Sequence, residues 1–411
     1  MRRLHFALLS LVLVLAAQPL VAATYYVGTC KSGAYANISG AVALVPAGST
    51  IDVCPGTYNE QVTISKPLTL RGISYGNSSQ AIIAMAPSGL TTTSSLAFGT
   101  VAAQVEVTAG PVNITGITVD GTSPSANCPS PGVAYVGVFY SSGSSGTVNQ
   151  VETQYQSCNL GGVGILAENG AGPSKSVTIE NSYIHDSSYG GIWAYSNQNP
   201  PSLTASINGN SVASVAPPTI NGTFVYNNGP VVGIEVHGTD GGVSNNSISQ
   251  TDSGLIISSS IPVSGNTVIG TGVADFGIEV WADAVVSGNT VANAWNGMYV
   301  GNSGASVKSN HILLATPIVS GMAPNGPYGI LLGANDVTVE NNVITGSVES
   351  NIFTGANLPL GALGIEFDCF TDTVSGNMIN GVLWGIDAPA AYTGVNTFSN
   401  VPTVRQPGGS C

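Results

Sequence analysis

Residues 263–268 read VSGNTV, and residues 286–291 repeat the same six letters. Related phrases stand at 243–248, 339–344 and 374–379. Apolar and polar residues alternate within each phrase, which is the period of a β-strand, and glycine and asparagine interrupt the alternation as turns require. A second phrase, a glycine followed by an apolar residue, recurs at intervals of 20 to 42 residues: Gly137-Val138, Gly164-Ile165, Gly191-Ile192, Gly233-Ile234, Gly254-Leu255, Gly277-Ile278, Gly297-Met298, Gly329-Ile330, Gly364-Ile365 and Gly385-Ile386.

A repeat of this length, built from short strands and tight turns, is the sequence signature of a solenoid. Leucine-rich repeats have a similar length but need a dense leucine pattern, and propeller blades need about twice the period. The sequence therefore predicts an all-β fold, a right-handed parallel β-helix solenoid. Each repeat would form one coil, and each strand would stack at ~4.8 Å on the same strand of the next coil.

An asparagine recurs at the turn inside the VSGNTV-type phrase. A row of exposed asparagines could bind a ligand, but an inward asparagine at a sharp turn can instead satisfy buried amides of the coils above and below. We assign the row a structural role. Its members are Asn210, Asn246, Asn266, Asn289, Asn310, Asn342, Asn377 and Asn396.

The N-terminal residues 1–23 have the pattern of a secretory signal peptide. Arg2 and Arg3 precede an apolar run, and small residues at 21–23 provide a cleavage site. The apolar run is short for a membrane span, which needs about 20 residues, and no other stretch is long enough. We expect a secreted or periplasmic protein without a membrane span. Residues 24–411 would form one β-helix domain, with the cap and first coils at 24–72 and regular coils at 137–400.

The opening of this domain carries further motifs. Ile38, Val42 and Val45 have helical spacing, which predicts a short N-terminal capping helix over the open end of the solenoid. The letters PGTYNE at 55–60 and KPLTLRG at 66–72 follow. This opening resembles that of the pectin-lyase-like β-helix superfamily, as found in pectin methylesterases and periplasmic β-helix proteins. The resemblance implies the β-helix fold over nearly the whole mature chain. The catalytic motifs of the superfamily's lyases, polygalacturonases and esterases are absent.

Charge is scarce in this sequence. Charged residues make up 7% of the chain, and 21 acidic against 8 basic side chains give a formal net charge of −13. A basic nucleic-acid-binding surface is thereby excluded, and an acidic protein repels a polyanionic substrate. Lys308 falls in the same outward column as Glu340 of the next coil, which predicts an ion pair.

The candidate functional face is the outer side of the strand that begins with the glycine–apolar phrase. Outward positions there bring aromatic residues beside carboxylates, a combination that suits sugar rings because the rings stack and the carboxylates take hydroxyls or exchange protons. The candidate substrate-binding residues are Trp193, Tyr195, Trp281 and Tyr299. Long inserts at about 213–231, 313–328 and 345–363 leave one edge of the rod and would wall this face.

Three residues of this face are candidates for catalysis: Glu235, Glu279 and His237. Glu235 and Glu279 are two coils apart, so their Cα atoms should lie ~9.6 Å apart, near the carboxyl separation of inverting glycosidases. His237 could act as a base. The alternative is a solvent-facing strand without a catalytic role.

Acidic residues gather near the C-terminal end of the same columns. Glu366 and Asp387 lie on adjacent coils with Asp368 nearby, and carboxylates this close repel one another unless a proton or a cation intervenes. Calcium, with its preference for oxygen ligands, is the candidate cofactor. The alternative is a solvated acidic end without a metal.

Two classes of function remain open from the sequence. The first is an exported protein that engages a polysaccharide or cell-wall glycan, as a carbohydrate-active enzyme of glycoside hydrolase, lyase or epimerase type. The second is a non-catalytic cell-surface or extracellular structural or adhesion protein, for which a rigid rod suffices. In either case we expect a monomer with no nucleic-acid partner.

The cysteines generate a prediction about covalent structure. An even number of cysteines in an exported chain favours disulfides, and the lack of a CxxC pair argues against zinc. Pairing between neighbours is expected: Cys30 with Cys54, Cys128 with Cys158, and Cys369 with Cys411. Peptide mapping of the unreduced protein should recover these three pairs, and a free thiol at Cys54 would contradict the scheme.

Overall fold

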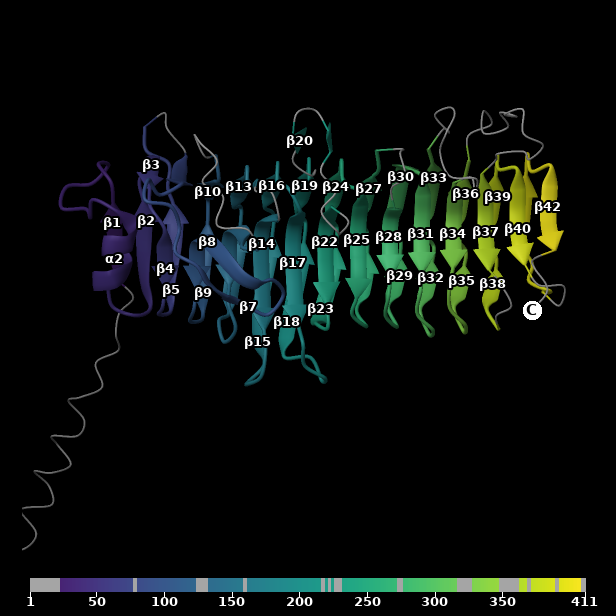
Figure 1. Ribbon diagram of the computed structural model, residues 1–411, viewed down its shortest axis with the longest axis horizontal. Helices are drawn as coiled ribbons and strands as arrows, with labels where there is room; N and C mark the ends of the chain where they lie inside the picture. Colours follow the sequence, from purple (N-terminus) through teal and green to yellow (C-terminus); the bar gives the residue numbers. More distant parts are fainter. Residues whose placement is uncertain are drawn as a thin grey trace, which may run out of the picture.

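The computed structural model describes residues 23–76, 80–122, 132–157, 161–215, 219–220, 223–224, 231–271, 276–315, 327–346, 362–367, 371–388 and 392–407. The predicted signal peptide, except for Ala23, therefore lies outside the described residues. The chain winds into a long rod of stacked coils, with its first strands at one end and its last at the other (Figure 1). Three parallel sheets run the length of the rod, and each coil contributes one strand to each sheet.

Sheet A carries the first half of the VSGNTV-type phrase. Its strands, in stacking order, are β1 Thr24–Val27, β2 Ser49–Val53, β5 Leu68–Gly72, β9 Val112–Thr115, β12 Gly146–Asn149, β15 Lys175–Glu180, β18 Leu203–Asn208, β23 Asp240–Ser244, β26 Pro262–Ser264, β29 Val285–Ser287, β32 Ser306–Lys308, β35 Thr338–Glu340 and β38 Thr373–Ser375.

Sheet B follows the asparagine turn. Its strands are β3 Gly56–Asn59, β6 Ala81–Ala84, β10 Ile117–Asp120, β13 Glu152–Gln154, β16 Tyr183–His185, β19 Ser211–Ala213, β24 Ser247–Ser249, β27 Thr267–Ile269, β30 Thr290–Ala294, β33 His311–Leu314, β36 Val343–Thr345, β39 Met378–Asn380 and β41 Thr397–Ser399.

Sheet C begins with the glycine–apolar phrase and carries the candidate face. Its parallel strands are β4 Val62–Ile64, β8 Gly99–Val107, β11 Ala134–Tyr140, β14 Gly162–Asn169, β17 Gly190–Ser196, β22 Val232–His237, β25 Ser253–Ser258, β28 Phe276–Val280, β31 Asn296–Val300, β34 Tyr328–Leu332, β37 Leu363–Phe367, β40 Trp384–Ala388 and β42 Thr403–Pro407. Two short antiparallel pairings stand outside this pattern: β7 Thr93–Ser95 pairs with β8, and β20 Thr219–Ile220 pairs with β21 Thr223–Phe224.

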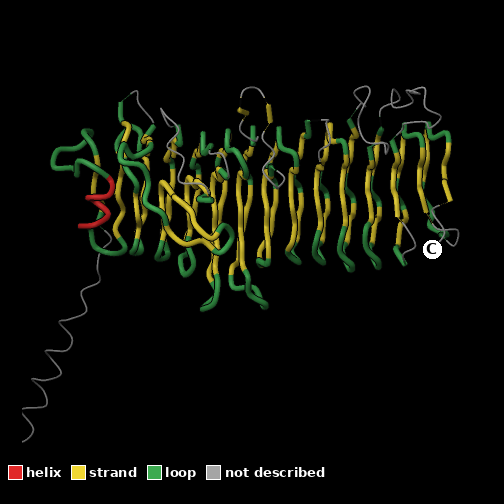
Figure 2. Tube along the Cα trace, in the orientation of Figure 1, coloured by secondary structure: helices red, strands yellow, loops and turns green. Residues whose placement is uncertain are grey.

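The predicted all-β, right-handed parallel β-helix is thus confirmed, as is its capping helix. Helix α2 spans Ile38–Leu44, begins at the N-cap Asn37 and buries Ile38, Ala41 and Val42 over the first coil. Figure 2 shows it at the N-terminal end of the strands. Glu60, from the PGTYNE motif, accepts hydrogen bonds from the first backbone N–H groups of the helix at 2.7 and 2.8 Å. Within the described residues, no helix is long and apolar enough to span a membrane.

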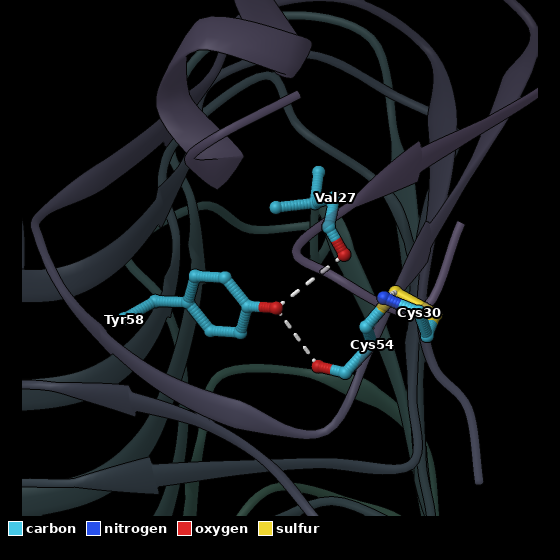
Figure 3. The surroundings of a disulfide bond; sticks show 4 residues. All are labelled: Val27, Cys30, Cys54 and Tyr58. Carbon is cyan, nitrogen blue, oxygen red and sulfur yellow. Dashed lines mark hydrogen bonds between the residues drawn. A yellow bond between two sulfur atoms is a disulfide. The ribbon is translucent and has the colours of Figure 1, made fainter. Parts of the chain in front are cut away.

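A disulfide joins the cap to the first coil. Cys30 is bonded to Cys54, as predicted, and the Tyr58 hydroxyl beside it donates to the carbonyl oxygens of Val27 and Cys54 (Figure 3). The remaining four predicted partners, Cys128, Cys158, Cys369 and Cys411, lie outside the described residues.

The glycine of each glycine–apolar phrase marks the corner where the chain enters sheet C. A Cβ atom at Gly277 would lie 2.3 Å from the buried Val291 side chain and 2.5 Å from the carbonyl oxygen of Gly297 on the next coil. Neighbouring glycines of the column face the same two obstacles. Only a residue without a side chain lets successive coils approach this closely, and this explains the periodicity seen in the sequence.

The asparagine row forms a buried ladder, as predicted. Each Oδ1 accepts hydrogen bonds from the backbone N–H and the side-chain Nδ2 of the preceding asparagine, at 2.8–3.0 Å from Asn210 through Asn396. From Asn210 to Asn377, the residue before the ladder asparagine has a positive φ, for example 66° at Gly265 and 56° at Asn245, so glycine and asparagine recur there.

One ladder asparagine tests this role. In Asn289→Ala, the backbone N–H and the Nδ2 of Asn266 lose their common acceptor inside the rod. We expect a loss of about 3 kcal/mol of stability, since each unsatisfied buried donor costs about 1–3 kcal/mol. Urea unfolding should show it as a lower midpoint. Asn302→Ala, which removes a hydrogen bond to Ser303 on the surface, should leave the midpoint almost unchanged; equal effects would refute the structural assignment.

Candidate functional site

The register of sheet C aligns the predicted face. Residues at the first outward position pair from strand to strand in the predicted order, which is Trp193, Glu235, Ile256, Glu279, Tyr299, Leu331, Glu366 and Asp387. The inward neighbours, such as Ile234 and Val236, are fully buried in the main core. Residues far apart in the chain thus come within one or two strand spacings of one another.

Glu235 and Glu279 project from β22 and β28, with Ile256 of β25 between them. Two strand spacings separate their Cα atoms, or ~9.6 Å in a regular stack. Glu235 is half-buried, and this burial, followed by the negative charge of Glu279, raises the pKa of its carboxyl to about 7. A carboxyl of this kind keeps its proton at a pH where most carboxyls are ionised.

Glu279 has a different environment. Its carboxylate accepts a hydrogen bond from the buried Ser253 hydroxyl at 2.6 Å and another from the Trp281 indole at 3.3 Å. Hydrogen bonds donated to both oxygens suit an ionised carboxylate and hold it in one orientation. The two carboxyls therefore differ in environment: burial raises the pKa of Glu235, while both oxygens of Glu279 accept hydrogen bonds. Acid–base hydrolysis of a glycosidic bond uses two carboxyls in unlike environments.

Aromatic residues continue the face beyond Glu279. The Trp281 side chain is 46% exposed, and its ring lies 4.8 Å from that of Tyr299, centroid to centroid. Trp281 has a double role here, because it offers a stacking surface and donates to Glu279. These two residues form an open aromatic platform beside the carboxyl pair.

Tyr195 and His237 form a separate pair. Their rings are stacked at 5.0 Å with an interplanar angle of 14°, and His237 is exposed. His237 lies two residues after Glu235 on the same face of β22. The stacking gives His237 a defined position at the rim of the face, and a role for it as a base stays a prediction.

Trp193 does not stand open on the face as a free platform. Its ring packs against Phe98 at 4.8 Å and against Tyr189 at 5.5 Å. Phe98 comes from residues 85–98, which we call the flap; it links β6 to β8 and lies across the outer side of sheet C near β8 and β14 (Figure 1). Trp193 is therefore the edge of a covered aromatic cluster, because the flap packs on this part of the sheet.

Sequence reasoning missed the flap, Tyr189 and Ser253. The flap lies in a stretch, 73–136, without the repeat phrases, so periodicity carries no signal for it. Ser253 precedes a glycine–apolar phrase by one residue. The start of the strand is irregular, so the alternation of residues there does not predict the direction of the Ser253 side chain.

The acidic end is only partly described. Glu366 and Asp387 are register partners on β37 and β40, as predicted, while Asp368 lies outside the described residues. In the part of the chain that the structure describes, no group of three acidic, histidine or cysteine residues is arranged to hold a metal. A calcium site involving Asp368 stays a prediction. Most of each long insert predicted to wall the face also falls outside the described residues.

Three of the described cations have polar partners at other faces of the rod. Arg71 pairs with Asp52 at 2.8 Å, Lys308 pairs with Glu340 at 3.2 Å as predicted, and Lys66 donates to carbonyl oxygens at the end of α2. Lys175 lies on β15 of sheet A. None of these four side chains belongs to the outward columns of sheet C that carry Glu235 and Glu279.

Comparison with known proteins identifies the fold. No protein-family model matches the sequence, and no curated protein matches it. The structure is similar to that of the GH136 lacto-N-biosidase from Eubacterium ramulus, with a TM-score of 0.58 and 12% identity over 87% of this chain and 68% of that one. It is also similar to the alginate lyase AlyF-OU02 in complex with G6, with a TM-score of 0.51 and 13% identity over 93% and 85% of the two chains. What these likenesses share is the parallel β-helix fold.

The raised pKa of Glu235 predicts a pH dependence of stability. The folded protein binds this proton more tightly than the unfolded chain, whose carboxyl has the ordinary value of 4.5, so stability falls as pH rises from about 4.5 through about 7. The loss amounts to at most about 3 kcal/mol. Glu235→Gln should remove the share of this decline that Glu235 contributes and leave the share of Glu168 and Asp372, whose pKa values burial also raises; thermal midpoints from pH 4 to 8 measure it. In Glu279→Gln the decline should move to lower pH; identical profiles for all three proteins would contradict the assignment.

Proposed function

We propose that this protein is an extracytoplasmic glycoside hydrolase that acts on a neutral polysaccharide, with Glu235 as general acid and Glu279 as general base. The observation that carries the proposal is the pair of carboxyls two strands apart in different environments: burial favours the proton on Glu235, and both oxygens of Glu279 accept hydrogen bonds. The aromatic platform of Trp281 and Tyr299 beside them supplies a surface on which sugar rings stack.

The chemistry follows from this arrangement. The Glu235 carboxyl donates its proton to the glycosidic oxygen while the bond from that oxygen to the anomeric carbon breaks. A water molecule attacks the anomeric carbon from the opposite face, and the Glu279 carboxylate takes a proton from it. The separation of about two strand spacings leaves room for this water between the carboxyl and the sugar, which favours inversion of the anomeric configuration.

Charge supports a neutral substrate. The chain has a formal net charge of −13, and Arg71, Lys308 and Lys66 have their polar partners at other faces of the rod. An acidic face repels a uronate polymer unless cations offset the charge. Lyase and epimerase chemistry on uronates would require such a charge-neutralising group near the carboxyl pair, so hydrolysis of an uncharged chain is the reaction that fits these residues.

Two further observations agree with this proposal. The fold neighbours include proteins named as a lacto-N-biosidase and an alginate lyase, so this scaffold carries enzymes of carbohydrate chemistry. The Cys30–Cys54 disulfide is typical of proteins that work in an oxidising compartment, outside the cytoplasm.

Release of reducing ends tests the proposal. The purified protein is incubated with arabinoxylan, mixed-linkage β-glucan, galactomannan, polygalacturonate and alginate, with and without calcium. We expect release from a neutral member of this panel, and a rate that falls as pH rises above about 7 because Glu235 loses its proton. Glu235→Gln and Glu279→Gln should each lower the rate by about 10²–10⁴-fold.

The control is Glu340→Gln, which removes a carboxylate from sheet A on another face of the rod and should keep full activity. Release that survives in both Glu235→Gln and Glu279→Gln would place the active site elsewhere. No release from any polymer would favour the non-catalytic surface or structural protein, and binding without release would be visible by affinity electrophoresis in the same polymers.

A further inference from the structure

We infer that the flap makes this protein act on chain ends: it stops a bound glycan close to Glu235, so that hydrolysis removes short units from one end of the polymer. This inference rests on the proposed function, and it concerns where along a chain the reaction takes place. The observations that carry it are the position of the flap, the way it is anchored, and the course of the outward column.

The first step is the direction of the substrate. Glu235, Glu279 and Tyr299 follow one another across adjacent or next-adjacent strands of sheet C. A glycan that contacts both carboxyls and the platform must therefore run along the rod axis, across the strands. Its path leads from Tyr299 past Glu279 and Glu235 toward β17.

The second step is the obstacle on this path. Trp193 is the direct register partner of Glu235 on β17, and its ring is packed under Phe98 and beside Tyr189. The carbonyl oxygen of Tyr189 accepts a hydrogen bond from the backbone N–H of Val232, on the strand of Glu235, at 3.0 Å. Farther along, the outward residues Phe139 and Leu166 are completely buried in the cluster to which Phe98 belongs. The first outward column of sheet C is therefore covered at β17, β14 and β11.

The third step is the anchoring of the flap. The buried Glu168 carboxylate accepts hydrogen bonds from the Ser95 hydroxyl at 2.8 Å, from the Leu96 N–H at 2.9 Å and from the Ala97 N–H at 3.3 Å. Toward the other end of the flap, Gln61 exchanges hydrogen bonds with Thr91. Fixed at both places, the flap is a wall of the site and keeps Phe98 on Trp193.

The fourth step is the room that remains. The bond to be cleaved lies between the two carboxyls, over Ile256, and Trp193 is two strand spacings away, ~9.6 Å. Since a pyranose ring is comparable in length to one strand spacing, only a short chain end fits between the bond and the wall. On the other side Trp281, Tyr299 and Leu331 are at least partly exposed and can hold the continuing chain.

The test compares chain shortening with bond cleavage on the neutral polysaccharide of the panel that the protein hydrolyses. Solution viscosity and reducing ends are followed together, and products are separated by size. The wild-type protein should release short oligosaccharides from the first minutes with little loss of viscosity. Phe98→Ala and Glu168→Gln, which remove the wall and its anchor, should raise the viscosity loss per reducing end several-fold.

The matched control is Ser88→Ala, an exposed position of the flap whose hydroxyl donates to the carbonyl oxygen of Gly89 within the flap, and it should behave as the wild type. Phe98→Ala changes the flap and Glu168→Gln changes its anchor on β14. If the thermal midpoint shows that one variant is misfolded, the other still tests the inference. Random internal cleavage by the wild type, or an unchanged product pattern in a folded flap variant, overturns the inference while the proposed function stands. Failure to hydrolyse any polymer overturns both.

Discussion

Every functional arrangement in this protein depends on the in-register stacking of its coils. The asparagine ladder maintains this register from inside, since each amide bridges to the next coil through two hydrogen bonds to one oxygen. Buried amides gain strength from the low dielectric around them and are costly to leave unpaired, so a slip of one residue would break the whole row. The glycine column acts with it, because its lack of side chains permits the close approach of coils at the corner before sheet C.

Because of this register, residues that are distant in the sequence lie at fixed separations on the surface of the rod. Glu235 and Glu279 are far apart in sequence, yet the stack sets them two strands apart on one rigid surface. A rigid surface suits acid–base chemistry, because proton donor and acceptor need fixed positions before the substrate arrives. The difference between the two carboxyls then comes from their immediate neighbours: burial around Glu235, and the donors Ser253 and Trp281 around Glu279.

The flap shows how a solenoid with an open face can acquire selectivity. On a regular β-helix, the face of a sheet is uninterrupted from one end of the rod to the other, so a long polymer could bind at any position along it. A single irregular segment, anchored by the buried Glu168 and packed through Phe98, divides the face into a covered and an open part. The candidate carboxyls lie next to this division, where the surface changes from packed core to exposed platform.

The sequence predicts more of the fold than of the candidate site. Periodicity determined the parallel β-helix, the asparagine ladder, the capping helix and the outward columns that contain Glu235, Glu279 and Trp281, because a strand's alternation and a coil's repeat are local properties of the chain. The Cys30–Cys54 bond was also within reach, since its spacing is close to one repeat.

Tertiary structure alone decided the covering of Trp193, the hydrogen bond from Ser253 to Glu279 and the raised pKa of Glu235. The flap that covers Trp193 has no repeat, and its place on sheet C follows from packing of Phe98 with Tyr189 and Trp193, which are distant in the sequence. Burial and charge proximity are sums over such distant neighbours, and no local pattern of residues encodes them.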